Sequence, residues 1–420
     1  MRRVLFVTPA FLPENHISAR RPAGLAKYLR EFGWEVTVLT QCEPAHLRDP
    51  VSPEELRREA GLDESRVLRI VRSVRPLSAN PLLKAMRGIA EYWVLPGSDN
   101  SRTARQGLRQ ARGLSLDVDA IWATAPGYSV FLIASGLSRR LGVPWVADFR
   151  DIAEKYVVYP WWVRKVMAWR EARFCRTAAR ITTIEPNAHI LSRRHRAPIT
   201  FISNGFDPEQ LCEAPGRPEG DVFRIVYTGT IQGRQDPGPI LQAVDELVRD
   251  GAIPASEIAV EFHGCLGRRA RRACLPEARR SAAPVRQLPW VPNAEALRVQ
   301  RGATVLLSLG IPGAPCVLPG KLFEYMAAGR PVLAYPSDPE GVDPLLASTG
   351  IGRACGSVAE AKAVLLGWHR EWKGTGDIRM DRRPAEIQKW SRREQAGALG
   401  AVLDSASPPG TPCPLAAGWR

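Results

Sequence analysis

The sequence predicts an α/β protein of two domains, each built on a largely parallel, doubly wound sheet covered by helices. The chain has 420 residues, which is long for a single hydrophobic core. Short β-branched apolar runs alternate with stretches of helical periodicity, as in βαβ units. This alternation stops in a segment rich in Gly, Pro and acidic residues, 204–221, and then starts again.

The first domain is expected at 1–204. An apolar run at 3–9 predicts a strand, apolar residues at helical spacing predict a helix at 20–32, and Gly33 ends that helix. A second strand is expected at 35–40. The later elements are a strand at 120–124, a helix at 128–141 and strands at 143–148, 181–184 and 199–203.

A linker is expected at 205–221 and a second domain at 222–384. Its elements are strands at 224–230, 258–264, 286–288, 304–309 and 331–335, and helices at 239–248, 293–301 and 321–328. A final amphipathic helix is expected at 385–405 and a flexible tail at 406–420.

Composition narrows the class of protein. No uncharged stretch approaches the roughly 20 apolar residues of a membrane-spanning helix. No signal peptide is indicated, because Pro9, Pro13 and Glu14 interrupt the apolar run after the N-terminus. The eight cysteines are scattered, which favours buried free thiols over disulfides or a metal site. We therefore expect a cytoplasmic protein.

The formal net charge of +15 invites a polyanionic partner. Only eight of the 58 basic residues are lysine, however, and an arginine-rich bias can arise from coding-sequence composition. No basic-aromatic motif for nucleic acid is evident, so no nucleic-acid partner is expected.

The strongest functional signal is the run L-P-G-K-L-F-E-Y-M-A-A-G-R-P-V-L-A at 318–334. Proline and Gly320 before a helix leave its first N–H groups free for an anion, and Lys321 adds a positive charge. Glu324 lies one turn further on the same face, where a carboxylate can accept both hydrogen bonds of a ribose diol. The alternative is a surface ion pair on an ordinary amphipathic helix, and the residues alone leave the two about even.

A second signal is the strand-to-loop segment at 226–237, which contains Gly229 and Arg234. Loops at the carboxyl ends of parallel strands bind ligands in open α/β sheets. Arg234 could therefore reach the same diphosphate, although a solvated loop arginine is the alternative.

The loop after the first strand has no glycine before Gly24, so the dinucleotide fingerprint of redox enzymes is missing there. It carries His16 and Arg20 instead, with Arg21 beside them. Asp148, Arg150 and Asp151 lie at the end of the strand expected at 143–148. Their carboxylates and guanidinium suit sugar hydroxyls. The alternative is a structural salt-bridge cluster.

Tryptophans and cations mix at 156–173, where Trp161, Trp162 and Trp169 stand among arginines and a lysine. Such a segment suits a helix on an anionic membrane. Packing against the body of the domain is the alternative, and it is favoured.

In this order, the motifs resemble those of the retaining glycosyltransferases of family 4, which have the GT-B fold. The resemblance covers nearly the whole chain. It rests on the segments 25–40, 144–151, 181–184, 202–208 and 227–229 and on G-K-L-F-E-Y at 320–325.

The resemblance implies two Rossmann-like domains facing a cleft, with the acceptor in the first domain, a nucleoside-diphosphate sugar in the second, and no metal. It implies a catalytic role for Arg234, Lys321 and Glu324. Donor-binding positions are Gly229, Val291, Gly313, Cys316, Gly320 and Leu322. Acceptor-side positions are His16, Arg20, Asp148, Arg150 and Asp151.

The chain departs from the family at Cys316, where the usual E-x7-E motif has its first glutamate. Reduced activity is therefore conceivable, and two alternatives stay open: a non-catalytic protein that binds nucleotide sugars, and a sugar-nucleotide epimerase of the same fold. The acceptor of a transferase would be a glycan, a lipid-linked saccharide or a small molecule, and an anionic membrane surface is a further candidate partner.

Overall fold

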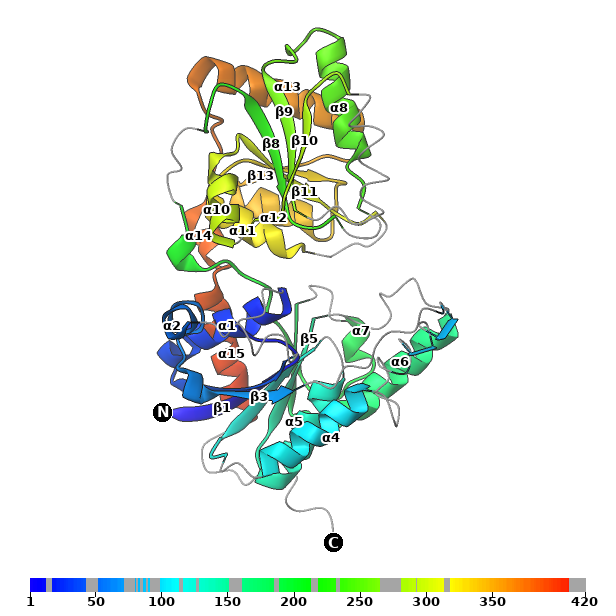
Figure 1. The fold of residues 1–420 in the computed structure, drawn as a ribbon, viewed down its shortest axis with the longest axis vertical. Helices are drawn as coiled ribbons and strands as arrows, with labels where there is room; N and C mark the ends of the chain where they lie inside the picture. The colour runs from blue at the N-terminus through cyan, green and yellow to red at the C-terminus, as the bar shows by residue number, and fades with distance from the viewer. Residues whose placement is uncertain are drawn as a thin grey trace. The chain divides into compact units, whose positions relative to one another are not determined.

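The computed structural model describes residues 1–12, 17–42, 52–71, 80, 82–83, 86–87, 90, 99–112, 116–125, 128–150, 161–184, 189–212, 218–231, 235–264, 281–291, 293–312 and 318–407. The chain forms two compact units (Figure 1). The first unit comprises Met1–Asn204 and Arg392–Arg420, and the second comprises Gly205–Ser391. Each unit holds a parallel sheet with helices on both faces, so the predicted α/β class is confirmed.

The first unit has a seven-stranded sheet in the order β3-β2-β1-β4-β5-β6-β7. All neighbouring strands are parallel. The order reverses between β1 and β4, which is the switch point of this sheet. The strands are β1 (Arg2–Thr8), β2 (Trp34–Cys42), β3 (Val67–Val71), β4 (Ala120–Thr124), β5 (Trp145–Phe149), β6 (Arg180–Thr183) and β7 (Ile199–Phe201).

Side chains of this sheet point alternately into two cores. Leu5 and Val7 of β1 belong to one buried cluster, whereas Val4 and Phe6 belong to the other. Strands buried on both faces read as continuous apolar runs, which explains why the sequence predicted them well. The helices on the Leu5 side are α4 (Asp99–Arg112), α5 (Ser129–Leu141), α6 (Trp161–Phe174) and α7 (His189–Ser192), and those on the Val4 side are α1 (Ile17–Leu29), α2 (Pro53–Ala60) and α15 (Arg392–Ala406).

The C-terminal part of the chain corrects one prediction. One helix was expected at 385–405, but the structure has two, α14 (Pro384–Gln388) in the second unit and α15 in the first. α15 packs against α1 and the turn after it: the Cβ of an alanine at Gly397 would lie 2.9 Å from the ring of Phe32. Asp404 of α15 accepts a 2.9 Å hydrogen bond from the Trp34 indole. The helical periodicity runs through both helices, so it does not reveal the break.

The second unit has a six-stranded sheet in the order β10-β9-β8-β11-β12-β13. Its pairs are also parallel, and the order reverses between β8 and β11. The strands are β8 (Phe223–Thr228), β9 (Ile258–His263), β10 (Val285–Leu288), β11 (Val305–Leu309), β12 (Val332–Tyr335) and β13 (Gly352–Ala354). The helices are α8 (Gly238–Arg249), α10 (Asn293–Gly302), α11 (Gly320–Ala328), α12 (Val342–Thr349), α13 (Val358–Thr375) and α14.

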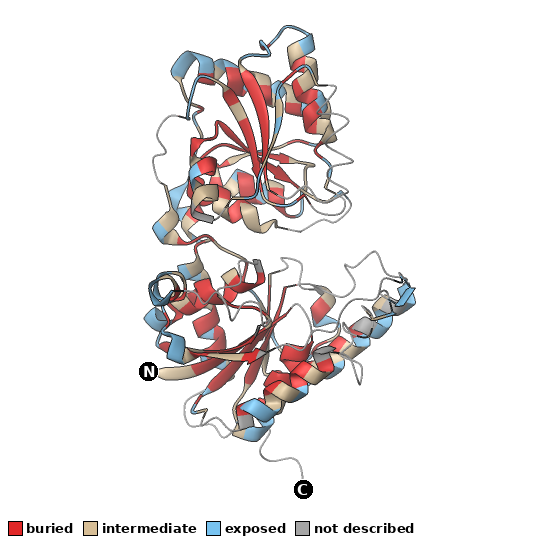
Figure 2. Ribbon diagram, viewed as in Figure 1, coloured by how far each residue is buried: buried red, intermediate tan, exposed pale blue. Residues whose placement is uncertain are grey.

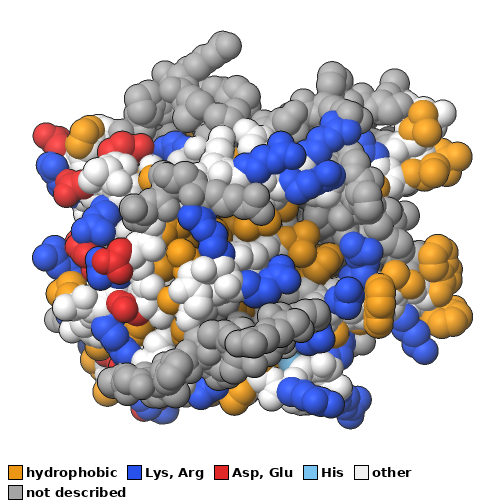
Figure 3. All heavy atoms as spheres, turned by 90° about the horizontal axis from the view of Figure 1, so that it is seen from below, with side chains coloured by type: hydrophobic (Ala, Val, Ile, Leu, Met, Phe, Trp, Pro, Cys, Tyr) orange, Lys and Arg blue, Asp and Glu red, His pale blue; other side chains and the backbone are white. Residues whose placement is uncertain are grey.

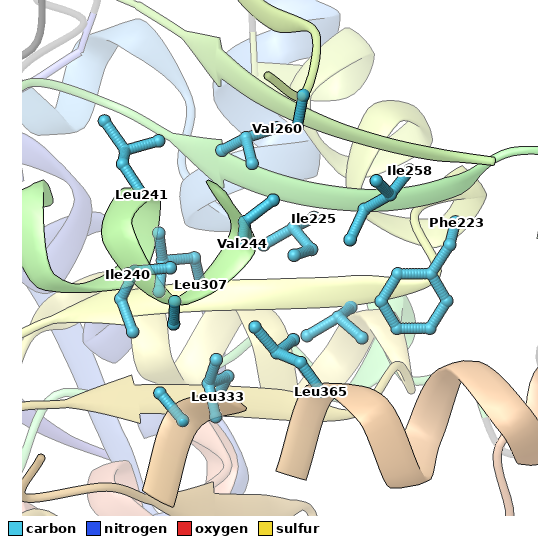
Figure 4. Close-up of a cluster of buried hydrophobic side chains, with 14 of the residues drawn as sticks. Phe223, Ile225, Ile240, Leu241, Val244, Ile258, Val260, Leu307, Leu333 and Leu365 are labelled. Carbon is cyan, nitrogen blue, oxygen red and sulfur yellow. The ribbon is translucent and has the colours of Figure 1, made fainter. Parts of the chain in front are cut away.

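Two apolar cores hold the second sheet between its helices. Figure 4 shows one of them, in which Leu241 of α8 and Leu365 of α13 meet Ile225 and Leu307 of the sheet. Residues of α10, α11, α12 and α14 form the other. Figure 2 shows the buried strands at the centre of each unit and exposed residues on the outer sides of the helices.

The expected linker at 205–221 is part of the second unit. Phe206 is buried in the core that contains α11, and its N–H donates to the carbonyl of Trp390 at 3.2 Å. Cys212 N–H likewise donates to the Ala327 carbonyl at 2.8 Å. The described parts of this segment, 205–212 and 218–221, are therefore bonded to the second unit, which a composition argument does not predict.

Within the described part of the chain, none of the helices has the length and apolar content needed to span a membrane.

Candidate functional site

The carboxyl end of the second sheet is the first place to look for a ligand site. Open α/β sheets bind ligands outside the carboxyl ends of their strands, at the point where the strand order reverses. In this unit that point lies between β8, which ends at Thr228, and β11, whose following loop leads to α11 at Gly320. The residues that the sequence singled out at 226–229 and 318–325 therefore come together there.

Lys321 is the central residue of this site. Its Nζ lies 3.5 Å from the centroid of the Tyr227 ring on β8, a cation–π distance. It also comes within 3.4 Å of where a Cβ at Gly229 would stand. Nζ itself is buried, and no group of the described residues forms a hydrogen bond with it.

Burial lowers the pKa of Lys321 to about 7, and only Glu324 opposes this shift. An ammonium group in such a place has lost its water without gaining a carboxylate or carbonyl in exchange. Buried cations in folded proteins are ordinarily paired. The free Nζ therefore indicates a site prepared for an anion.

The N-terminal end of α11 adds further positive potential. Pro319 precedes the helix in an extended conformation and caps it with no side-chain hydrogen bond, and the first turn contains no acidic residue. Gly320 is the first helical residue. Free N–H groups and the helix dipole at such an end favour an anion, beside the Lys321 ammonium.

Glu324 follows Lys321 by three residues and is partly exposed. Its carboxylate has no hydrogen bond to the rest of the described chain, so the predicted surface ion pair with Lys321 is not formed. Leu322 differs from both, because its side chain is fully buried in the core beneath α11. A contribution of Leu322 to ligand binding would have to come from its backbone.

Tyr325 fixes α11 against the end of β8. Its hydroxyl oxygen accepts a 3.1 Å hydrogen bond from the backbone N–H of Thr228. The Thr228 hydroxyl in turn accepts from the Gln300 amide at 2.9 Å. Burial raises the pKa of Tyr325 to about 12, so the phenol stays protonated. Tyr325 ends the G-K-L-F-E-Y motif, but its anchoring role is not predictable from the sequence pattern.

Two glycines let the loops after β8 and β9 approach each other. Gly229 and Gly264 have φ of +107° and +135°, where other residues are strained. A Cβ at Gly264 would lie 2.6 Å from the carbonyl oxygen of Gly229. The Gly229 N–H donates to the carbonyl of His263 at 2.8 Å. This contact holds the loop that borders Lys321.

The remaining predicted donor-side positions are placed as follows. Val291 is partly buried, next to Trp290, whose side chain is half exposed. Arg234, Gly313 and Cys316 lie outside the described residues, so their predicted roles stay predictions.

In the first unit, Asp148 is a structural residue. It is fully buried and accepts hydrogen bonds from both Arg21 Nη2 at 2.9 Å and Arg21 Nε at 3.1 Å. The hydroxyls of Thr124 and Thr182, on the neighbouring strands, each donate to it at 2.7 Å. These four bonds occupy the carboxylate, so the salt-bridge alternative describes Asp148 and the sugar-binding prediction for it is wrong.

The other acceptor-side positions are less fully placed. Arg20 lies on α1 and is partly exposed, whereas Arg150 is buried directly after β5. His16 and Asp151 lie outside the described residues. Only Arg20 and Arg150 can therefore be located at this end of the first sheet.

Among the residues that the structure describes, no group of three His, Cys, Asp or Glu side chains could hold a metal ion. Metal-independent activity stays a prediction.

Comparisons with known proteins identify the fold of the whole chain and the type of the first domain. Residues 18–205 match the model of the glycosyl transferase 4-like domain. HepE from Anabaena, solved with UDP and glucose, has a TM-score of 0.66 at 12% identity over 96% of this chain and 100% of its own. Sucrose-phosphate synthase from Thermosynechococcus elongatus has a TM-score of 0.61 at 13% identity, over 96% of this chain and 99% of its own. The candidate UDP-N-acetylglucosamine 2-epimerase of Listeria monocytogenes has a TM-score of 0.56 at 12% identity, over 96% of each chain.

No curated protein matches the chain by sequence at a significant level. The structural likenesses show that the chain has the GT-B fold, and residues 18–205 are similar to the glycosyl transferase 4-like domain. The predicted resemblance is confirmed.

Proposed function

We propose that the protein is a retaining glycosyltransferase that moves a hexosyl group from a nucleoside-diphosphate sugar to an acceptor. The observation that carries the proposal is the buried, unpaired ammonium of Lys321 at the start of α11, with Glu324 one turn away. A cation, free helix N–H groups and a diol-accepting carboxylate in this order match the pyrophosphate and ribose of one ligand.

In this proposal the second unit binds the donor. Lys321 Nζ pairs with the diphosphate, the N-terminal end of α11 donates hydrogen bonds to it, and Glu324 accepts from the ribose hydroxyls. Arg234 supplies a second cation. Because the HepE structures contain UDP, a uridine nucleotide is the first donor to test.

The chemistry follows from where charge develops. As the bond between the anomeric carbon and the phosphate oxygen breaks, negative charge grows on the leaving diphosphate. A cation in a site with little water stabilises that charge far more than it would in solution. We propose that the leaving phosphate also takes the proton of the acceptor hydroxyl, and that the acceptor oxygen bonds to the anomeric carbon on the face that the phosphate leaves. This keeps the anomeric configuration without a protein nucleophile and without a metal.

The first unit is proposed to hold the acceptor at the carboxyl end of its sheet, where Arg20 and Arg150 lie. Asp148 and Arg21 contribute there by fixing the start of α1 against β5. The acceptor is a glycan, a lipid-linked saccharide or a small molecule, and we place the reaction in the cytoplasm.

Thermal unfolding with a panel of nucleotides tests this proposal. A ligand that binds only the folded state raises the melting temperature by mass action, by an amount set by its concentration relative to Kd. We expect UDP, or another member of the panel GDP, ADP and dTDP, to stabilise the wild type. The shift should disappear in Glu324→Ala and persist in Glu386→Ala, which removes a carboxylate from the surface of α14. Equal shifts in wild type and Glu324→Ala would refute the assignment.

An epimerase is the second candidate, favoured by the structural likeness to the Listeria protein. The two activities differ in their products. An epimerase converts its nucleotide sugar into an epimeric nucleotide sugar without any acceptor, whereas a transferase at most hydrolyses it slowly. Incubation of the stabilising nucleotide sugar with the protein alone, followed by chromatography, distinguishes them.

A non-catalytic protein would bind the nucleotide sugar and return it unchanged with every acceptor offered. This outcome would support the proposed donor site and contradict the proposed transferase activity.

A further inference from the structure

Helix α6 divides into a buried face and an exposed face. Ala168 and Glu171 are buried, as is Cys175 just after the helix. Glu171 accepts hydrogen bonds from the Tyr128 hydroxyl at 3.0 Å and from Arg194 at 2.6 Å. These bonds anchor α6 to the first unit and neutralise its one acidic side chain, so the helix presents a fixed outer face.

The outer face of α6 is both apolar and basic. At 3.6 residues per turn, the side chains of α6 that the structure describes as exposed fall within an arc of roughly 140°. Three of its side chains are tryptophans that are 64%, 53% and 62% exposed. Among the described side chains of α6, the exposed ones are Trp161, Trp162, Lys165, Val166, Trp169 and Arg173, which we call the α6 face.

Large exposed aromatic side chains are unusual on a protein surface. Three of them on one arc form an apolar patch of the kind that marks an interaction site. Figure 1 shows α6 reaching the right-hand edge of the first unit, and Figure 3 shows hydrophobic side chains next to lysines and arginines at that edge.

The two cations of the α6 face form no ion pair within the part of the chain that the structure describes. Lys165 lies over the Trp161 ring, 5.2 Å from its centroid, and neither Lys165 nor Arg173 forms an ion pair with any described residue. The pKa of Arg170, beside them, is lowered by burial and then by the charge of Arg173. The described side chains of this face therefore carry positive charge that no described acidic residue pairs with.

We propose that the α6 face is a docking surface for an anionic lipid bilayer. Tryptophan rings reside at the boundary between head groups and acyl chains, because their apolar bodies enter the membrane while the indole N–H stays near water. Lysine and arginine next to them bind anionic head groups. A protein partner for the same face would need acidic residues around an aromatic-accepting groove, and a mixture of tryptophan and cations on one convex helix fits a fluid anionic surface better.

The consequence for the acceptor rests on the proposed function. A transferase that docks through its acceptor-binding unit reaches substrates in the bilayer, so the acceptor is a lipid-linked saccharide. The docking itself needs no donor, and the vesicle experiment below is independent of nucleotide binding.

Co-sedimentation of the full chain with vesicles of phosphatidylglycerol and phosphatidylcholine tests the docking. The wild type should bind these vesicles and not vesicles of phosphatidylcholine alone. Binding should weaken as salt screens the lipid charge. Trp161→Ala/Trp162→Ala/Trp169→Ala should lower the partition coefficient at least about tenfold. The control Trp290→Ala removes an exposed tryptophan of the second unit and should bind like wild type.

Charge reversal provides an independent variant. Each cation near an anionic surface raises the partition coefficient about fivefold. The double variant Lys165→Glu/Arg173→Glu should therefore lower the partition coefficient about 25-fold or more at low salt. The control Arg353→Glu/Arg370→Glu changes the net charge equally on exposed positions of the second unit and should have a smaller effect. All these positions are exposed, and thermal unfolding verifies that each variant folds.

Brominated lipids report the depth of insertion. They should quench part of the wild-type tryptophan emission, and the quenching should vanish in the triple alanine variant. The proposal fails if the wild type does not bind anionic vesicles, or if both α6 variants bind them as strongly as the wild type does. It fails equally if the tryptophans prove to mediate self-association, seen as a dimer in sedimentation that the triple variant abolishes.

Discussion

Replacing Lys321 with methionine should stabilise the ligand-free protein and abolish nucleotide binding. Methionine has nearly the length of lysine and carries no charge, so it fills the same space over the Tyr227 ring. The substitution removes an ammonium group that the folded protein holds without a hydrogen-bond partner among its described residues. A binding residue that destabilises its own protein is the expected signature of a prepared anion site.

The magnitude follows from the pKa of Lys321, which is about 7 in the folded protein against 10.5 for an unperturbed lysine. At neutral pH this difference of roughly 3 pKa units lowers the free energy of unfolding by at most about 4 kcal/mol. The folded protein binds fewer protons than the unfolded chain between these two pKa values. Wild-type stability should therefore rise with pH from about 7 to about 10.5, and the advantage of Lys321→Met should shrink over the same window.

Urea unfolding measures this advantage for wild type, Lys321→Met and the control Lys389→Met at about pH 6.5 and about pH 9.5. Lys389 is 65% exposed, so its replacement should change stability little at either pH. Titration calorimetry with the stabilising nucleotide follows the loss of affinity. The reasoning is refuted if Lys321→Met is less stable than wild type at the lower pH, or if its advantage does not depend on pH.

Three further substitutions probe the surroundings of the site by thermal or urea unfolding. Gly264→Ala should destabilise by about 2–4 kcal/mol, because its Cβ would meet a backbone oxygen at 2.6 Å; Gly251→Ala, also at positive φ but with no atom nearby, should cost only about 1 kcal/mol. Asp148→Asn leaves the buried Arg21 guanidinium without its counter-charge and should cost about 3–5 kcal/mol. Tyr325→Phe removes the acceptor of a buried backbone N–H and should cost about 1–3 kcal/mol.

Each of these has an outcome that would contradict it. Equal effects at Gly264 and Gly251 would mean that the close approach of the two loops is not present. Asp117, which is 74% exposed and pairs with Arg3, is the control for Asp148; similar losses from both asparagine variants would disprove a structural role for the buried pair. An unchanged stability in Tyr325→Phe would indicate that another group satisfies the Thr228 N–H.

The sequence predicted most strands of the two sheets because they are buried on both sides, but the edge strand β3 (Val67–Val71) was missed. The strand at 120–124 was located to the residue, since all five of its side chains are buried and apolar or nearly so. The edge strand Gly352–Ala354 was not anticipated, because three residues beginning with glycine carry no such pattern. The helix after it was also missed, although Ser357 caps it by accepting from the Glu360 N–H, a readable S-x-x-E signature.

The candidate site was only partly predictable. Lys321 and Glu324 could be named from their spacing, but the burial of Lys321 Nζ, which favours the anion site over a surface ion pair, could not be predicted. For Asp148 the same kind of reasoning failed, because its partners Thr124, Thr182 and Arg21 are distant in sequence. Similarly, a helical pattern cannot show which face of α6 meets the domain body. Ala168 and Glu171 pack there, whereas the predicted contact of the tryptophans with a membrane stays a prediction.

A crystal structure of the complex with the nucleoside diphosphate that stabilises the protein most would test the central claim directly. The account predicts pyrophosphate oxygens within hydrogen-bond distance of Lys321 Nζ and the N-terminal end of α11, with the ribose hydroxyls donating to Glu324. A nucleotide bound elsewhere, with Lys321 still unpaired over Tyr227, would contradict it.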